Sequence, residues 1–448
     1  MDKCAAINVL ELISSLNYAG SQRALVNFCR YSDRHFFKMH VATYIEGGPR
    51  EKEIHDLGIE CVIFKNDIAS LLKYVAQKNI QIVHFHRSGH YVPFEHLVLQ
   101  KLKSQNPLLV IVETNIFGKY DARSASLIDC SLVISKMNLN EVFVKQAGVF
   151  DFNRMRTLYF PVDAASFAKN IPTQEEITAY KKKNNIQPAD FVIGRLGRPD
   201  IAKWSDLLIE TVPYLVKLIP RIKYLIQSAP ESRKRQVLTG RYRDNFIFVE
   251  PSAEDKDIAL FFSSLDVYAH ASKIGESFGM TLAEAGLFKK PVVVNSTPQR
   301  DNSQVEVVNH MQTGIIANGP QAFARAVAYL YAHPKEKERM GEAARFKVLQ
   351  EYDAEATTRC LEKVFVEKLL QKNIPVCQTV IDLYAKINYF PSENDLVAYR
   401  KDYQKRIANT FSPLTNKEMV YNALFKPKKM YRKVIDFIEH RFKQKKMY

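Results

Sequence analysis

Two carboxylates, Glu276 and Glu284, stand eight positions apart in the sequence with Gly279 between them. The apolar residues 267–269 before them are typical of a buried strand, and residues 281–288 are typical of a helix. The pattern therefore predicts a strand, a short loop and a helix, with one carboxylate in the loop and one on the helix.

The helix start at Gly279 is suited to an anion. A glycine there lets a ligand approach the backbone, and the free N–H groups of Met280 and Thr281 would then face it. We predict a diphosphate at this position, with the two carboxylates holding hydroxyl groups on either side. A sugar nucleotide combines these groups, because it consists of a sugar, a diphosphate and a ribose.

The stretch from Glu276 to Glu284 resembles the Glu-x7-Glu signature of retaining GT-B glycosyltransferases of family 4. The resemblance implies that Glu276 lies beside the donor sugar and that Glu284 binds the ribose hydroxyls. It also implies that the segment between them contacts the donor. This segment comprises Phe278, Gly279, Met280 and Thr281. The alternative is a strand–loop–helix joint with two surface glutamates.

Two cations follow the strand-like residues 191–196. Arg198 and Lys203 are five positions apart, just before a helix-like segment at 205–218. Cations in this place can neutralise the charge that builds on a departing diphosphate. Gly197-Arg198 with Lys203 resembles the Gly-Arg…Lys pair of the family, so the expected catalytic residues are Glu276, Arg198 and Lys203. The alternative is a pair of solvated surface cations.

The first part of the chain alternates strand-like and helix-like segments, which predicts a parallel, doubly wound sheet. Ligands bind outside the carboxyl ends of the strands in such sheets. Gly20 lies after the first strand, in a loop that resembles the Gly-Gly-x-Glu-Arg loop of the family, and we expect it at the donor. The strands are expected at residues 6–12, 40–45, 61–64, 80–85, 108–113 and 131–134.

Three polar residues near these strand ends are expected on the acceptor or sugar side: His86, Glu113 and Asn115. The family often has a His or Asp after the strand at 108–112, and this chain has Glu113-Thr114-Asn115 there, so a catalytic histidine is not carried over. His84 and His86 lack further ligands at metal-binding spacing, and we expect no metal site.

The resemblance covers about residues 6–371. It implies an α/β fold of the GT-B type, with two Rossmann-like, doubly wound parallel-sheet domains facing a cleft. Residues 173–184 are predicted to be a linker helix with Thr173 as its N-cap. The expected bounds are 1–168 for the acceptor-side domain, 185–355 for the nucleotide-sugar domain, 356–372 for a crossover helix, and 373–448 for a basic helical extension.

Composition limits the class of protein. With 46% apolar and 25% charged residues, the chain is typical of a soluble globular protein. Six scattered cysteines without a C-x-x-C pair indicate reduced thiols. No signal peptide and no uncharged apolar run of about 18 residues is present. These features predict a cytoplasmic protein, or one attached to a membrane from that side.

The formal charge of +16 is concentrated near the end of the chain, because residues 371–448 contain 16 lysines and arginines against 7 acidic residues. Between residues 426 and 448, apolar side chains fall on one face of a basic amphipathic helix. Such a helix can bind an anionic membrane surface or pack on the protein body, and the sequence favours neither. Nucleic-acid binding is disfavoured because no recognised module accompanies the charge.

We therefore expect a retaining glycosyltransferase that moves a hexose from a nucleoside-diphosphate sugar to an acceptor hydroxyl. A lipid-linked or cell-surface glycan is the kind of acceptor that we consider. No cofactor or metal is expected, and the base is left open between UDP and GDP. One alternative is a catalytically silent nucleotide-sugar-binding protein. An NAD-type or epimerase enzyme is disfavoured, because no G-x-G-x-x-G follows the first strand.

Overall fold

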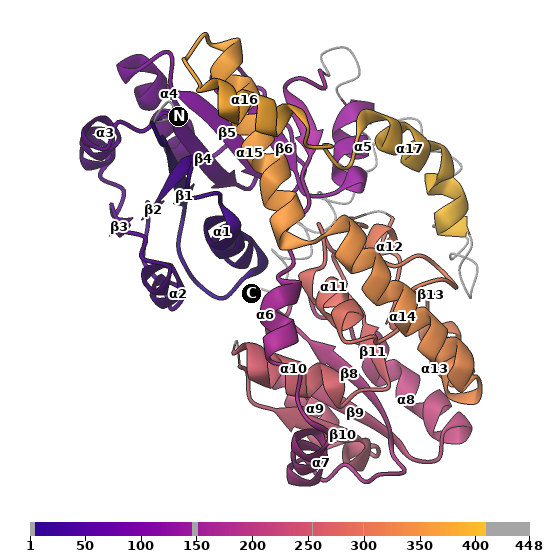
Figure 1. Cartoon of the computed structure of the whole chain (residues 1–448). Coiled ribbons are helices and arrows are strands. Elements are labelled where there is room, and N and C mark those ends of the chain that lie inside the picture. The colour runs from indigo at the N-terminus through magenta and orange to yellow at the C-terminus, as the bar shows by residue number, and fades with distance from the viewer. Residues whose placement is uncertain (1–4, 146–150, 253, 299, 409–448) are drawn as a thin grey trace, which may run out of the picture.

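The computed structural model describes residues 5–145, 151–252, 254–298 and 300–408. These residues form two domains, each built on a parallel sheet (Figure 1). The first sheet has the strand order β3-β2-β1-β4-β5-β6-β7. Its strands are β1 (Ile7–Ile13), β2 (Phe37–Thr43), β3 (Cys61–Ile63), β4 (Ile82–Arg87), β5 (Val110–Asn115), β6 (Cys130–Val133) and β7 (Met155–Thr157).

Helices cover both faces of this sheet, and the alternation of side chains along each strand divides its residues between the two. On β1, Val9 packs with Phe28 of α1, whereas Leu10 packs with Leu99 of α4. The helices are α1 (Gly20–Tyr31), α2 (Glu51–Asp56), α3 (Ile68–Gln77), α4 (Pro93–Gln105) and α5 (Lys136–Lys145), with the 3-10 turn η1 (Ala125–Leu127).

The second sheet has the order β10-β9-β8-β11-β12-β13 and is also parallel. Its strands are β8 (Phe191–Leu196), β9 (Ile222–Gln227), β10 (Phe246–Val249), β11 (Val267–His270), β12 (Val292–Val294) and β13 (Gly314–Ile316). Its helices are α8 (Leu207–Leu218), α9 (Glu231–Leu238), α10 (Asp255–Ser263), α11 (Met280–Leu287), α12 (Gln304–Val307), α13 (Pro320–Ala332) and α14 (Pro334–Glu351), with the turn η2 (Arg243–Asn245).

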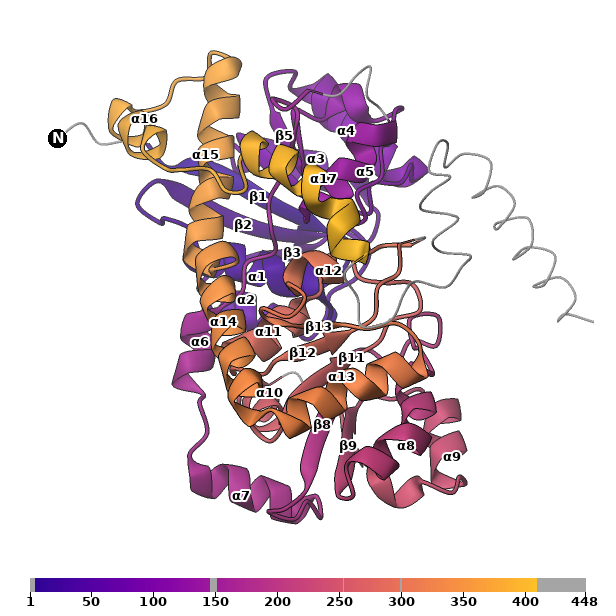
Figure 2. The same cartoon turned by 90° about the vertical axis from the view of Figure 1, so that its right-hand side faces the viewer.

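The chain passes twice between the domains. It leaves the first through α6 (Ala164–Lys169) and α7 (Gln174–Lys183), and returns through α15 (Ala354–Gln371), which packs on α1 (Figure 2). Thr173 caps α7 in a capping box with Glu176, as the sequence predicts. A buried aromatic cluster joins the domains, with Tyr159 in edge contact with Tyr352 at 4.8 Å between ring centroids.

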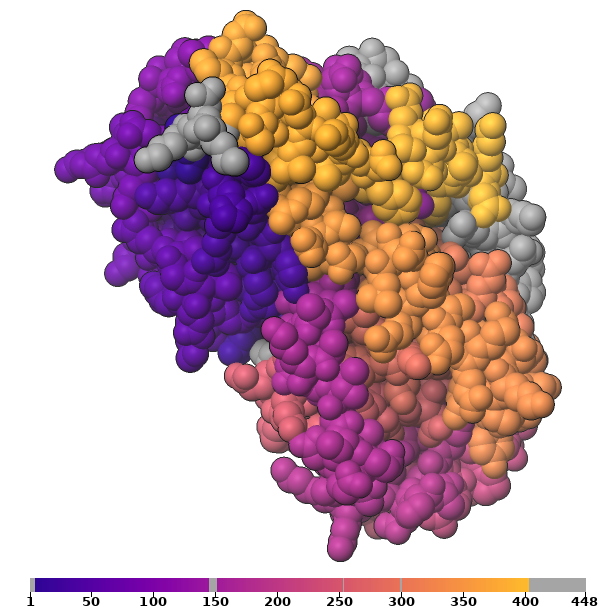
Figure 3. All heavy atoms as spheres, in the orientation of Figure 1, coloured from indigo at the N-terminus to yellow at the C-terminus, as the bar shows by residue number. Residues whose placement is uncertain are grey.

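The first part of the C-terminal extension packs on the first domain. Helix α16 (Gln378–Ala385) lies against α15, and α17 (Glu393–Ala408) lies against α5; the segment runs from orange to yellow over the surface in Figure 3. The predicted basic amphipathic helix at 426–448 lies outside the described residues. Within the part of the chain that the structure describes, no helix combines the length and apolar character needed to cross a membrane.

The cysteines differ in state. Cys29, Cys61, Cys130 and Cys360 are free thiols, as expected. Cys377, just before α16, is disulfide-bonded, so the expectation of reduced thiols is wrong for this residue.

The contact of α17 with α5 yields a stability prediction. Leu396 is 2% exposed and packs with Val133, Leu139 and Val142. Replacing Leu396 by Ala leaves a cavity and should lower the free energy of unfolding by about 2–5 kcal/mol. Urea denaturation measures this loss. The neighbouring Val397, which is 41% exposed, serves as the control: equal losses in Leu396→Ala and Val397→Ala would contradict the packing.

Candidate active site

The start of helix α11 has the backbone that the sequence predicts. Gly279 adopts φ +104° and ψ +60°, a left-handed conformation, and a Cβ atom there would lie 2.7 Å from Leu282 Cδ1. The N–H groups of Leu282 and Ala283 donate to the Gly279 carbonyl, so the helical hydrogen bonds begin at this residue. The preceding N–H groups, of Met280 and Thr281, belong to the unpaired first turn that attracts anions.

The carboxylate of Glu276 is held from two sides. Lys203 Nζ donates to Glu276 Oε2 at 2.7 Å, and His270 Nε2 lies 2.8 Å from Oε1. Burial raises the pKa of Glu276, but Lys203 and His270 lower it further, to about 2. Burial lowers the pKa of His270. The side chain is therefore a neutral imidazole whose Nε2–H donates to an ionised carboxylate.

Backbone contacts bring Lys203 to this place. The N–H of Lys273 donates to the carbonyl of Lys203 at 3.0 Å, and Trp204 forms a bridge with Ser272. The segment after β8 is thereby fastened to the segment after β11, which places the Lys203 ammonium beside Glu276. His270, the last residue of β11, is a site residue that the sequence analysis missed.

The arginine buried at this site is Arg195 rather than Arg198. Arg198 is exposed, and its assignment as a catalytic cation stays a prediction. Arg195, on β8, is 1% exposed and stacks over Trp204 at 4.2 Å. Its Nε and Nη1 atoms have no hydrogen-bond partner among the described residues. Burial lowers its pKa, while the nearby Glu276 carboxylate raises it. Arg195 and Lys203 therefore both interact with the charge of Glu276.

Glu284 lies on α11 facing the first domain. Burial raises its pKa, Arg23 lowers it and Asp255 raises it further. Arg23, on α1, forms an ion pair with Asp255 on α10 across the domain boundary. Gly20 is close by, since a Cβ on it would lie 3.5 Å from Met280 Cγ. The first-domain loop therefore meets the start of α11, as the sequence suggests.

Phe278 does not offer its side chain to a ligand. It is 2% exposed and its ring meets those of Tyr159, Phe160 and Tyr352 at 5.9, 6.0 and 5.1 Å between centroids. The side chain belongs to the aromatic cluster between the domains, so a donor contact at Phe278 would have to involve its backbone.

His86 and the pair Glu113 and Asn115 lie on opposite faces of the first sheet. His86 faces α1, where its Nε2 lies 2.6 Å from Glu11 Oε2, and His84 Nδ1 lies 2.9 Å from Glu11 Oε1. These three groups are near enough to hold a metal ion. Both carboxylate oxygens already lie at hydrogen-bond distance from a ring nitrogen. Burial raises the pKa of Glu11, but His84 and His86 lower it, to about 2. The place of His86, Glu113 and Asn115 on the acceptor or sugar side stays a prediction.

The domains also touch next to Glu276. Glu306 Oε1 and Oε2 accept from the N–H groups of Lys136 and Met137 at 3.2 and 3.0 Å, at the start of α5. Asn138 Nδ2 donates to the carbonyl of Ser277 at 3.3 Å. Ser277 Oγ donates to Asp301 Oδ2 at 2.5 Å. The loop that carries Glu276 is therefore anchored to the first domain.

The pKa of Glu276 gives a pH dependence. Its folded-state pKa of about 2 lies below the ordinary value of 4.5. The two contacts therefore stabilise the fold above about pH 4.5, and this stabilisation is lost as the pH falls toward 2. At 1.36 kcal/mol per pKa unit it amounts to roughly 3 kcal/mol.

Urea denaturation between pH 3 and 7 tests this. The difference in unfolding free energy between wild type and Glu276→Gln should shrink as the pH falls. Glu231→Gln, at a side chain that is 64% exposed, should show little difference at any pH. A Glu276 difference that stays constant across the range would contradict the assignment.

Solved structures share this architecture. A glycosyltransferase from Rickettsia africae is 17% identical, with a TM-score of 0.68 over 81% of this chain and 99% of its own. Anabaena HepE in complex with UDP is 15% identical, with a TM-score of 0.66 over 81% and 100%. Sucrose-phosphate synthase from Thermosynechococcus elongatus is 16% identical, with a TM-score of 0.62 over 81% and 100%. The predicted GT-B fold, with two Rossmann-like domains, is confirmed.

Sequence comparison agrees for the second domain. Residues 176–347 match the family model of glycosyl transferases group 1, and no curated protein sequence matches the chain. The matched segment contains Arg195, Lys203, Glu276 and Glu284. The chain thus has the GT-B fold of glycosyltransferases, and its second domain carries the group 1 sequence pattern around the buried Glu276.

Proposed function

We propose that the protein is a retaining glycosyltransferase that transfers a hexose from a nucleoside-diphosphate sugar to an acceptor hydroxyl. The observation that carries the proposal is the Glu276 carboxylate, buried beside two cations at the open first turn of α11. Related folds support a sugar nucleotide, since Anabaena HepE has been solved with UDP-glucose, at 16% identity and a TM-score of 0.65. We take a UDP-hexose as the first donor to test.

The donor diphosphate would lie against the N–H groups of Met280 and Thr281. Lys203 and Arg195 would neutralise the charge that develops as the bond between sugar and phosphate breaks. This set of charges supplies the electrostatic stabilisation that the leaving group needs, so the proposal includes no metal ion. Arg195 is suited to it, because two of its buried nitrogens have no partner among the described residues.

The two carboxylates would have separate tasks. Glu276 would orient the donor sugar through a hydroxyl while His270 keeps hold of Oε1, and Glu284 would bind the ribose hydroxyls. Transfer with retention would then place the acceptor hydroxyl on the face of the sugar that the diphosphate leaves. The departing phosphate oxygen would take the acceptor proton, because Lys203 and His270 lower the pKa of Glu276 to about 2 and make it a poor base.

The acceptor would enter from the first domain, on the side of Glu113 and Asn115. A lipid-linked or cell-surface glycan remains our proposal for its class. The positive charge of the last residues would then serve to hold the protein at an anionic membrane surface; most of these residues lie outside the described part of the chain.

Release of UDP from UDP-hexoses, with and without acceptor, tests the function. Glu276→Ala, Lys203→Ala and Arg195→Gln should each lower kcat by roughly 10²–10³-fold, as expected when a charged group that stabilises the transition state is removed. Arg198→Gln is the matched control, because Arg198 is exposed in the segment just after β8, and it should retain activity within a few-fold. Nuclear magnetic resonance of the product reports whether the anomeric configuration is retained.

Two results would contradict the proposal. Full activity in Glu276→Ala would contradict the assignment of the active site. An Arg198→Gln variant as inactive as Arg195→Gln would contradict a specific role for the buried guanidinium of Arg195. Donor binding without transfer or hydrolysis would favour the alternative of a catalytically silent nucleotide-sugar-binding protein. Thermal unfolding with each donor detects such binding, because a bound ligand stabilises the fold.

A further inference from the structure

A cavity of about 60 Å³ lies within the first domain. It is bounded by Glu113 on β5, Ser131 on β6 and Val142 on α5, and by the segment between β5 and η1. One water needs roughly 10–15 Å³ of such space, so the cavity has room for about four. That is enough for the hydroxyl-bearing edge of a sugar ring and too little for a lipid chain.

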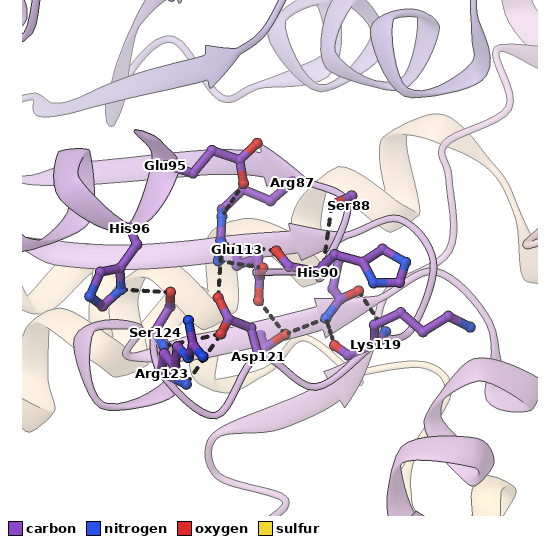
Figure 4. Close-up of polar contacts among 12 residues, drawn as sticks. Arg87, Ser88, His90, Glu95, His96, Glu113, Lys119, Asp121, Arg123 and Ser124 are labelled. Atoms are coloured by element: carbon purple, nitrogen blue, oxygen red, sulfur yellow. Dashed lines mark hydrogen bonds and ion pairs between the residues drawn. The ribbon is translucent and has the colours of Figure 1, made fainter. Parts of the chain in front are cut away.

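The polar floor of the cavity is built around one buried arginine (Figure 4). Arg87 Nε donates to Glu95 at 2.8 Å, Nη1 to Glu113 at 3.0 Å and Nη2 to Asp121 at 3.2 Å. Three carboxyl groups thus share a single guanidinium that is 1% exposed. Glu113 and Asp121 both line the cavity. Each of their carboxylate oxygens already accepts at least one hydrogen bond, and a carboxylate oxygen has room for a second.

The cationic groups that line the cavity are already engaged. Lys119 Nζ forms an ion pair with Asp301 at 3.6 Å, and Arg154 Nη2 donates to the carbonyls of Ala125 and Ile128 at 2.6 and 3.0 Å. An anionic ligand such as a phosphate would therefore meet two buried carboxyl groups, while the two cations among the described lining residues already have oxygen partners. A ligand with hydroxyl donors is favoured instead.

One side of the cavity is apolar. Ile128, Val142 and Met155 supply aliphatic surface, and Tyr120 supplies an aromatic ring. Sugars combine hydroxyl groups at their edges with C–H groups on their faces. A wall of aliphatic and aromatic carbon beside a floor of carboxyl oxygens matches both parts of such a molecule.

The cavity lies close to the segment that carries Glu276. Lys119 lines the cavity, its ion-pair partner Asp301 accepts the hydrogen bond of Ser277 Oγ at 2.5 Å, and Ser277 adjoins Glu276. A glycan chain that reaches the donor sugar from the first domain could therefore place one of its other residues here.

We propose that this cavity is a saccharide subsite: a sugar residue of the acceptor, other than the one that receives the hexose, directs its hydroxyls at Glu113 and Asp121 and its C–H face at Val142. This inference rests on the proposed function in one respect, which is that the bound sugar is part of the acceptor. It assigns the acceptor to the hydroxyl-rich glycans, with recognition that does not depend on a lipid tail.

Binding of methyl glycosides of glucose, galactose, mannose and N-acetylglucosamine to the intact protein tests the subsite. At least one should show saturable binding by isothermal titration calorimetry or by chemical-shift changes, whereas inorganic phosphate should show none. Val142→Phe fills the cavity and should abolish the binding. The matched control is Val144→Phe on the same helix, where the side chain is 56% exposed and the binding should be unchanged.

Glu113→Gln keeps the volume and removes one carboxylate, which covers the case in which Val142→Phe does not fold. It should weaken the glycoside by roughly fivefold or more, as expected for the loss of a hydrogen bond to a charged acceptor. No binding of any glycoside, or equal binding in Val142→Phe and Val144→Phe, would overturn the subsite.

The variant Val142→Phe also separates this inference from the function itself. Hydrolysis of a UDP-hexose without acceptor should persist in Val142→Phe, because Val142 is not among the residues assigned to the donor site. If wild type hydrolyses the donor but binds no glycoside, the subsite fails and the proposed function stands. If glycoside binds and no donor is ever turned over, the proposed function fails while the cavity is still a saccharide site.

Discussion

The candidate site depends on keeping one carboxylate ionised inside protein. Glu276 is 7% exposed, and a buried carboxylate is costly unless its oxygens are paired. Lys203, which follows β8, and His270, at the end of β11, both pair with this carboxylate. Helix α11 begins four residues after Glu276. In the second sheet, β8 and β11 are neighbours, so their carboxyl ends meet at the start of α11. Parallel sheets bind ligands at this edge.

The first domain manages buried charge differently on the two faces of its sheet. On the α1 face, the two oxygens of the Glu11 carboxylate lie 2.9 and 2.6 Å from ring nitrogens of His84 and His86. On the opposite face, Arg87 serves three carboxyl groups beside a cavity. Of the two networks, only the second has members, Glu113 and Asp121, that line this cavity. We therefore propose a binding site only there.

The two domains are held in contact around the site by polar and aromatic groups together. Glu306 accepts from the first turn of α5, where a carboxylate also complements the helix dipole. Arg23 pairs with Asp255 and lowers the pKa of Glu284. The carboxylate that we assign to the ribose therefore interacts with a charge of the first domain. The aromatic cluster of Tyr159, Phe278 and Tyr352 fills the boundary behind them. Residues of both domains therefore set the position and the charge of the site together.

The sequence by itself determined the local features: the alternation of strands and helices, the capping box of α7 and the left-handed glycine before α11. Each depends on residues within a few positions of one another. Only the tertiary structure decided which arginine is buried, because Gly194-Arg195 and Gly197-Arg198 are alike as sequence, and Arg195 stacks on Trp204 while Arg198 faces solvent. The role of His270 and the loss of Phe278 to the core were likewise decided by packing between distant segments. Burial sets both charge state and access, and it is a property of the whole fold.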